Sequence, residues 1–255
     1  MYTVNENYFD VIDAPEKAYW LGFIWGDGYV AQRNRNGYIS YEFKLGLSEI
    51  DKEHLEKFKL DIQSTHPIKL YNVTGFDTTN KEARIFISNK KLGSTLYNKY
   101  NIQPRRNNFN NVIENVPKEF HSDLIRGLID SDGTIVSKNI QYKSINRKEF
   151  SIGIISNESV LDFFNNELLK NNFTTTIYKK TKRHDNADGL VKSIKITGNN
   201  KVFTILDWLY NDKKKISLER KYNKYIEIKN YMTKYIAEIG GLKDGKGNIL
   251  KKGEM

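Results

Sequence analysis

The sequence predicts an α+β fold built from two pseudo-symmetric repeats, each with the order helix, two strands, helix, two strands, helix (αββαββα). Three observations support this prediction. A glycine-containing apolar helix motif occurs twice, strand-like alternation follows each copy, and each half closes with a further apolar helix. Self-similarity at a nearly constant offset is typical of chains built from repeated supersecondary units.

The two motif helices align at an offset of 105 residues, with Trp20–Gly28 matching Ile125–Gly133. Glycine in a helix interior costs roughly 1 kcal/mol, and close approach of a second helix is the usual reason for accepting it. We therefore expect the two helices to pack face to face across a pseudo-two-fold axis. The small residues, one turn apart in each helix, are Gly22 and Gly26 in the first and Gly127 and Ser131 in the second.

The ends of these helices also carry signals. Asp13 is expected to cap the first helix, with Pro15 and Glu16 in its first turn. Gly28 and Gly133 are expected to be C-terminal caps, because glycine is common just after a helix.

The strands that follow show a two-residue period. Apolar residues alternate with polar or small ones from Tyr41 to Ser48, which predicts a sheet with one buried and one wet face. Asn36-Gly37 indicates a hairpin turn before this strand. Glu42–Leu47 matches Glu149–Ile154 at an offset of 107, which predicts two extra residues in the first hairpin of the second repeat.

Each repeat continues with a helix, a second hairpin and a final helix. The helices show apolar residues at helical spacing, and the last strand of each repeat alternates. We expect a first repeat over residues 1–100, a polar linker over 101–117, a second repeat over 118–239 and a flexible tail over 240–255. The apolar positions are Leu55 and Phe58, Val160, Phe163 and Phe164 in the helices, and Ile85, Ile87, Ile194 and Ile196 in the strands.

Composition limits the function. The formal net charge is +10, which makes a polyanion such as nucleic acid the first partner to consider. There are no cysteines, and the four histidines show no metal-ligand spacing, so a metal would be bound by oxygen, as Mg²⁺ is. We find neither a signal peptide nor a membrane-spanning run, and we expect a cytoplasmic or organellar protein that does not enter a membrane.

The motif helices both end in an acid. Asp27 and Asp132 stand in the last turn of their helices, where the helix dipole disfavours negative charge by roughly 0.3–1 kcal/mol. Packing the two helix ends together would also bring two carboxylates into mutual repulsion. A divalent cation held by both carboxylates reverses that effect. The sequence therefore predicts a metal site at the paired helix ends.

The two segments resemble the LAGLIDADG motif of homing endonucleases, including intron-borne members. Ile125–Gly133 departs from the motif at its first two residues and at Ser131, and the first copy has Trp25 where the family often has an acid. The resemblance implies that the second acid of each motif, Asp27 and Asp132, binds metal, and it sets Asp130 aside. We place Gly26 and Ser131, which precede these acids, in the same metal site.

The resemblance further implies a monomeric DNA endonuclease with a basic residue near each active site. Arg106 is the candidate for the first site, and Arg220 and Lys221 are the open alternatives for the second. The implied cofactor is Mg²⁺, as two or three divalent ions with Mn²⁺ as a substitute. The implied reaction is hydrolysis of both strands across the minor groove of a long asymmetric target, leaving four-base 3′ overhangs.

The resemblance also implies that the two sheets form a curved DNA-binding saddle, with polar residues of its wet surface reading base edges. Two other functions remain open on the same fold, an RNA maturase that binds intron RNA and a DNA-binding regulator that does not cut. The candidate DNA-binding residues are Gln32, Arg33, Arg35, Tyr38, Lys44, Lys69, Tyr71, Asn80 and Arg84 in the first repeat and Lys138, Gln141, Lys143, Arg147, Lys148, Tyr178, Lys180, Lys182, Arg183, Lys192 and Lys195 in the second.

Overall fold

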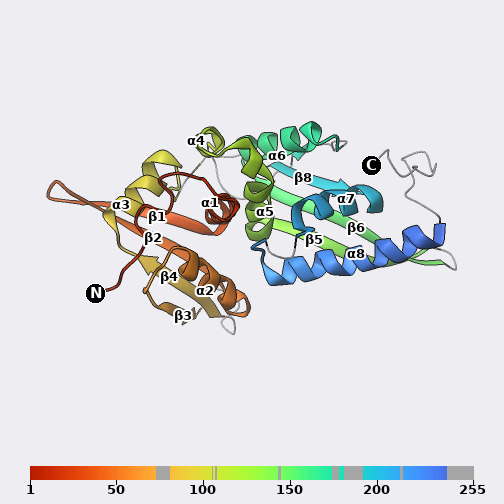
Figure 1. Cartoon of the computed structure of the whole chain (residues 1–255), viewed down its shortest axis with the longest axis horizontal. Coiled ribbons are helices and arrows are strands. Elements are labelled where there is room, and N and C mark those ends of the chain that lie inside the picture. The colour runs from red at the N-terminus through yellow and green to blue at the C-terminus, as the bar shows by residue number, and fades with distance from the viewer. Residues whose placement is uncertain are drawn as a thin grey trace.

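Two four-stranded antiparallel sheets dominate the computed structural model, which describes residues 1–72, 81–104, 106, 108–142, 145–173, 178–180, 192–212 and 215–239. Their strand orders are β1-β2-β4-β3 and β5-β6-β8-β7, so the second sheet repeats the topology of the first. The prediction of an α+β fold with two αββαββα repeats is confirmed (Figure 1).

Each repeat runs through its elements in the predicted order. The first consists of α1 (Pro15–Asp27), β1 (Gly28–Arg35), β2 (Tyr38–Ser48), α2 (Lys52–Asp61), β3 (Ile68–Asn72), β4 (Lys81–Ile87) and α3 (Lys90–Ser94), which continues as a π-helical turn over Thr95–Lys99. The second consists of α5 (His121–Ser131), β5 (Gly133–Tyr142), β6 (Ile145–Ser156), α6 (Glu158–Lys170), β7 (Tyr178–Lys180), β8 (Lys192–Thr197) and α7 (Asn199–Tyr210).

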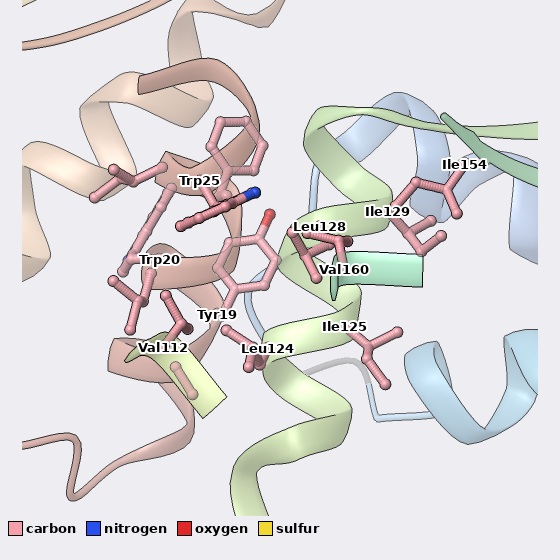
Figure 2. Close-up of a cluster of buried hydrophobic side chains, with 14 of the residues drawn as sticks. Tyr19, Trp20, Trp25, Val112, Leu124, Ile125, Leu128, Ile129, Ile154 and Val160 are labelled. Atoms are coloured by element: carbon pink, nitrogen blue, oxygen red, sulfur yellow. The ribbon is translucent and has the colours of Figure 1, made fainter. Parts of the chain in front are cut away.

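The motif helices α1 and α5 lie side by side between the two sheets (Figure 1). Their backbones approach so closely that a Cβ on Gly22 would lie 2.2 Å from the Leu124 carbonyl oxygen, and one on Gly127 would lie 2.1 Å from that of Tyr19. Side chains of Tyr19, Leu124 and Leu128 lie between the two helices (Figure 2). The packing that the small residues predicted is therefore present.

The alternation of β2 is confirmed as well. Tyr41, Phe43, Leu45 and Leu47 are buried against the helices, whereas the residues between them are partly or fully exposed. The turn before β2 has positive φ at Asn36 (51°) and Gly37 (83°), as a tight hairpin turn with the twist of the sheet requires.

The hairpin of the second repeat is longer than the sequence alignment indicated. Gly28 pairs with Leu45, 17 residues on, whereas Gly133 pairs with Ile154, 21 residues on, so the second hairpin has four extra residues rather than two. The faces of the strands were still assigned correctly at these positions, because a shift of two residues preserves the side on which a strand residue points.

Two expectations about the helix ends were wrong in detail. Ala14 is the N-cap of α1 without a side-chain bond, and Asp13 instead pairs with Lys17 at 2.8 Å. Gly28 is the C-cap of α1 and donates its N–H to the Ile24 carbonyl oxygen, but it is extended (φ −105°) and lacks the left-handed conformation of the usual glycine cap. Space explains the glycine at both ends, since a Cβ on Gly133 would lie 2.6 Å from the Ile129 carbonyl oxygen.

Two helices were not anticipated. The segment expected to be a polar linker contains α4 (Asn110–Asn115), and its Phe109 and Val112 are fully buried. Within the range expected for the second repeat, after its last predicted helix, lies α8 (Glu219–Ile239), which packs on β5 and α7 through Tyr225, Ile228 and Met232. The expected tail over 240–255 lies outside the described residues. No helix in the described ranges has the length and apolar character to cross a membrane.

Candidate active site

The ends of α1 and α5 bring the two motif aspartates together. Asp27 is the last residue of α1, and Asp132 follows the last residue of α5. A Cβ on Gly26 would lie 3.0 Å from Oδ2 of Asp132 and 2.1 Å from Oγ of Ser131. The carboxylate of one repeat thus lies directly against the helix end of the other, and only a glycine at position 26 leaves room for it.

The electrostatics of this pair are unfavourable for two anions. Burial and, after it, the neighbouring carboxylate of Asp132 raise the pKa of Asp27 from 3.8 to about 7, although Lys221, Arg220 and Arg106 act in the opposite direction. The pKa of Asp132 is also raised, again mainly because the surrounding groups displace water. The two carboxylates therefore resist being ionised together.

The donors present fit a hard divalent cation. The two carboxylates offer oxygen ligands, which Mg²⁺ and Ca²⁺ prefer, and a cation between them would relieve their mutual repulsion. Among the described residues no group of three or more His, Asp or Glu side chains is placed to bind a metal. A cation here would therefore need water, backbone carbonyls or a phosphate to complete its ligands.

Arg106 holds the backbone on both sides of Asp27. Its guanidinium donates to the carbonyl oxygens of Gly26 (2.7 Å) and Gly28 (2.8 Å), and to that of Gln103 (3.3 Å). It also lies 5.4 Å from the centroid of the Trp25 ring. Arg106 therefore fixes the turn between α1 and β1.

Lys221 occupies the corresponding place in the second repeat. Its Nζ donates to the carbonyl oxygens of Ile129, Asp130 (2.6 Å) and Gly133 (2.7 Å), and the side chain is buried in α8 against the end of α5. Burial lowers the pKa of Lys221 to about 8, whereas the nearby Asp130 acts in the opposite direction.

Arg220 lies elsewhere although it is adjacent in sequence. Its Nε donates to Oδ2 of Asp51 at 2.9 Å, and about half of its side chain (52%) is exposed. Consecutive residues of a helix point in different directions. Arg220 links α8 to the first repeat, and of the two candidates only Lys221 contacts the α5 turn.

Asp130 is fully buried, and its carboxylate is used in internal hydrogen bonds. It accepts hydrogen bonds from Tyr19 Oη (2.8 Å), Tyr210 Oη (2.6 Å) and the backbone N–H of Leu218 (2.7 Å). Tyr19 Oη lies 2.8 Å from Nε2 of His54, so a chain of hydrogen bonds crosses the repeat interface. No sequence signal pointed to this network, whose members come from α1, α2, α5 and α7.

The wet faces of the two sheets carry most of the described candidate DNA-binding residues. In the strand registers these residues alternate with the buried apolar positions. Three of the arginines are paired with acids on the same face, as Arg84 is with Glu82 at 2.8 Å. The residues on these faces are Arg33, Arg35, Tyr38, Lys44, Lys69, Tyr71 and Arg84 in the first sheet and Lys138, Arg147 and Lys195 in the second.

Four other candidates lie on the opposite face and not on the wet surface where they were expected. Gln32 donates to Tyr41 Oη at 3.1 Å, Lys148 pairs with Glu227 of α8 at 2.7 Å, and Lys192 pairs with Glu158. Gln141 shares the face of Lys148 in the register of β5 and β6. Polar composition alone selected these residues, but the two-residue period of the strand places them on the helix side.

The remaining candidates cannot be placed. Asn80, Lys143, Lys182 and Arg183 lie outside the described residues, and so do the side chains of Tyr178 and Lys180 in β7.

The paired helices, the two equivalent sheets and the acids at the helix ends define a two-repeat LAGLIDADG fold. Residues 119–204 match the family model of the LAGLIDADG-like domain. This match contains the second motif and confirms its resemblance to the family. No curated protein matches the chain by sequence.

Solved structures with the same fold include DNA-bound enzymes. I-SmaMI bound to cleaved DNA has a TM-score of 0.56 and 14% identity, over 87% of this chain and 91% of that one. I-SmaMI bound to an uncleaved target with calcium ions has a TM-score of 0.55 and 13% identity, over 87% and 92%. I-AabMI bound to uncleaved DNA has a TM-score of 0.55 and 12% identity, over 88% and 92%.

Proposed function

We propose that the chain is a site-specific endonuclease of double-stranded DNA, with one hydrolytic site in each repeat. The main support is the convergence of Asp27 and Asp132, one from each repeat, at tightly packed helix ends where both pKa values are raised. A protein selected only for stability would not keep two acids there. Two sites related by pseudo-two-fold symmetry suit a duplex whose strands are themselves related by two-fold axes.

Asp27 and Asp132 would hold two or three divalent cations, Mg²⁺ or in its place Mn²⁺. When bound, such ions activate a water nucleophile and stabilise the leaving oxygen at the phosphate. Gly26 and Ser131 are the proposed neighbours of these ions. Gly26 leaves space for the Asp132 carboxylate, and the hydroxyl of Ser131 donates back to its own helix, to the carbonyls of Gly127 and Leu128. The calcium-containing complex of I-SmaMI supports a divalent ion on this fold.

The wet faces of the two sheets would carry the DNA. Their arginines, lysines and tyrosines suit phosphate contacts and base edges, and the net charge of +10 favours a polyanion. The two faces differ in sequence, which favours a long asymmetric target bound by a single chain. Cleavage across the minor groove would leave four-base 3′ overhangs.

The function can be tested without knowing the target. Duplexes selected from a random library for binding in Ca²⁺ are transferred to Mg²⁺, and the products of both strands are measured. We expect wild type and the surface control Glu53→Gln to cut both strands. Asp27→Asn and Asp132→Asn should each lose cleavage while retaining binding in Ca²⁺.

The alternatives predict other results. A DNA-binding regulator would bind the selected duplexes and leave both strands intact in Mg²⁺ and Mn²⁺. A maturase without nuclease activity would prefer structured intron RNA over every selected duplex. Either result would contradict the proposed function.

A further inference from the structure

We propose that Arg106 and Lys221 are positioning residues that hold the backbone turns bearing the two aspartates, and that they touch neither the attacking water nor the phosphate. This inference rests on the proposed endonuclease function. The resemblance implied a basic group near each active site. In this inference Arg106 and Lys221 act on the protein backbone instead.

The hydrogen bonds of Arg106 bracket Asp27. One terminal nitrogen donates to the carbonyl before the aspartate, at Gly26, and the other donates to the carbonyl after it, at Gly28. The side chain is partly buried and also lies against the Trp25 ring. A guanidinium fixed at three points has little freedom to follow a substrate.

Lys221 uses all the hydrogens of its ammonium group within the protein. An ammonium group has three hydrogens, and three carbonyl oxygens accept them, those of Ile129, Asp130 and Gly133. Only 4% of the residue is exposed. No hydrogen of Nζ is left for a water or a phosphate oxygen while this arrangement lasts.

The two clamps act on equivalent atoms although the clamping residues come from unrelated segments. Gly28 and Gly133 occupy the same repeat position, and both cations donate to that carbonyl. Arg106 comes from the connection after the first repeat, whereas Lys221 comes from α8, which the first repeat lacks. What the two sites share is a buried cation on the free carbonyls at a helix C-terminus, where its charge also opposes the negative end of the dipole.

A second consequence concerns the kind of side chain that each clamp needs. Both cations act on backbone carbonyl oxygens beside the aspartates, so what they supply is positive charge and hydrogen-bond donors at a fixed place. This effect needs charge and position, and it needs no proton transfer. An exchange that keeps a cation should therefore retain part of the effect at either site, although lysine cannot reproduce the two-armed contact of Arg106 and arginine is larger than Lys221.

The test measures cleavage of each strand separately, in a duplex whose two strands carry different end labels, under single-turnover conditions. We expect Lys221→Gln to slow one strand by about 10- to 100-fold, as loss of an outer positioning contact typically does, and Arg106→Gln to slow the other. Lys221→Arg and Arg106→Lys, which keep the charge, should slow the affected strand less than the glutamine variants do and leave its pH profile unchanged. Lys224→Gln, one turn along α8, is the matched control.

The outcomes are distinct. If Lys221→Arg slows its strand as much as Lys221→Gln does, Lys221 takes part in the reaction and the inference fails. If both strands slow equally and the thermal midpoint falls in step, the residue only stabilises the fold, and the inference also fails. A strand-specific loss that is smaller in the conservative exchange supports it.

A second readout separates this inference from the proposed function. Hydrogen–deuterium exchange at the turns after Asp27 and Asp132 should be faster in Arg106→Gln and Lys221→Gln, respectively, and less so in the two conservative exchanges. If wild type cuts neither strand, the proposed function fails while this exchange pattern still supports the clamps. If exchange at the turns is the same in all variants, the clamps are refuted whether or not DNA is cut.

Discussion

The acid pair should make the protein less stable at neutral than at mildly acidic pH when no divalent cation is present. Burial and Asp132 raise the pKa of Asp27 from 3.8 to about 7, whereas in the unfolded chain Asp27 returns to its ordinary value. Between these two pH values the folded state holds more protons than the unfolded state. The free energy of unfolding therefore falls as pH rises through this window.

The size of the effect follows from the pKa. A rise of about 3 in pKa corresponds to about 4 kcal/mol, since each step of one is worth about 1.4 kcal/mol. Asp27 is only partly buried, and water screens part of this interaction. We therefore expect Asp27→Asn to raise the free energy of unfolding by about 2 kcal/mol at pH 8 and to change it little near pH 4.

Urea unfolding followed by tryptophan fluorescence measures this directly, in EDTA and then with excess MgCl₂. Wild type should gain stability from Mg²⁺ at pH 8, and Asp27→Asn should gain much less, because it lacks one of the two carboxylates. Glu53→Gln should behave as wild type throughout. If Asp27→Asn is no more stable than wild type at pH 8 in EDTA, or if Mg²⁺ stabilises both equally, the electrostatic explanation of the pair is wrong.

Three further predictions concern the helix interface, the buried network and the DNA face. Gly127→Ala should destabilise the protein by about 1–3 kcal/mol in urea unfolding. The added Cβ would lie 2.1 Å from the Tyr19 carbonyl oxygen, so the two helix backbones must separate. A stability equal to wild type would contradict this. Asp130→Asn should lower the thermal midpoint yet leave a measurable cleavage rate, because Asp130 accepts three internal hydrogen bonds. Abolition of cleavage in a folded variant would instead place Asp130 in the active site. Arg84→Ala should weaken binding of the selected duplex in Ca²⁺ and reduce the salt dependence of the affinity. Lys148→Ala should do neither, because Lys148 lies on the helix side of its sheet. Equal losses in the two variants would contradict the assigned faces.

Much of the fold could be predicted because it depends on local signals that repeat. Gly22 and Gly127 predicted that the two motif helices pack against each other, since close approach is the usual reason for glycine in a helix interior. The alternation in β2 predicted which face is buried. The motif register also separated Asp132 from Asp130, whose burial and three partners agree with a structural role.

The parts that could not be predicted depend on tertiary contacts. Arg220 and Lys221 are adjacent on a helix, so only the packing of α8 decides which one reaches the α5 turn. Gln32 and Lys148 were chosen for their polarity, and their faces follow from the sheet register and from α8, which covers part of the second sheet. The network that joins His54, Tyr19 and Asp130 brings together residues far apart in the chain, and no motif marks it.

The most direct test of the account is strand-resolved cleavage by the two aspartate variants on a duplex selected for binding. In Mg²⁺ we expect wild type to produce ends with four-base 3′ overhangs, and Asp27→Asn and Asp132→Asn to bind the same duplex and leave both strands uncut or cut no more than one. If wild type leaves the bound duplex intact in Mg²⁺ and in Mn²⁺, or if both variants cut both strands at the wild-type rate, these aspartates are not the centre of a nuclease.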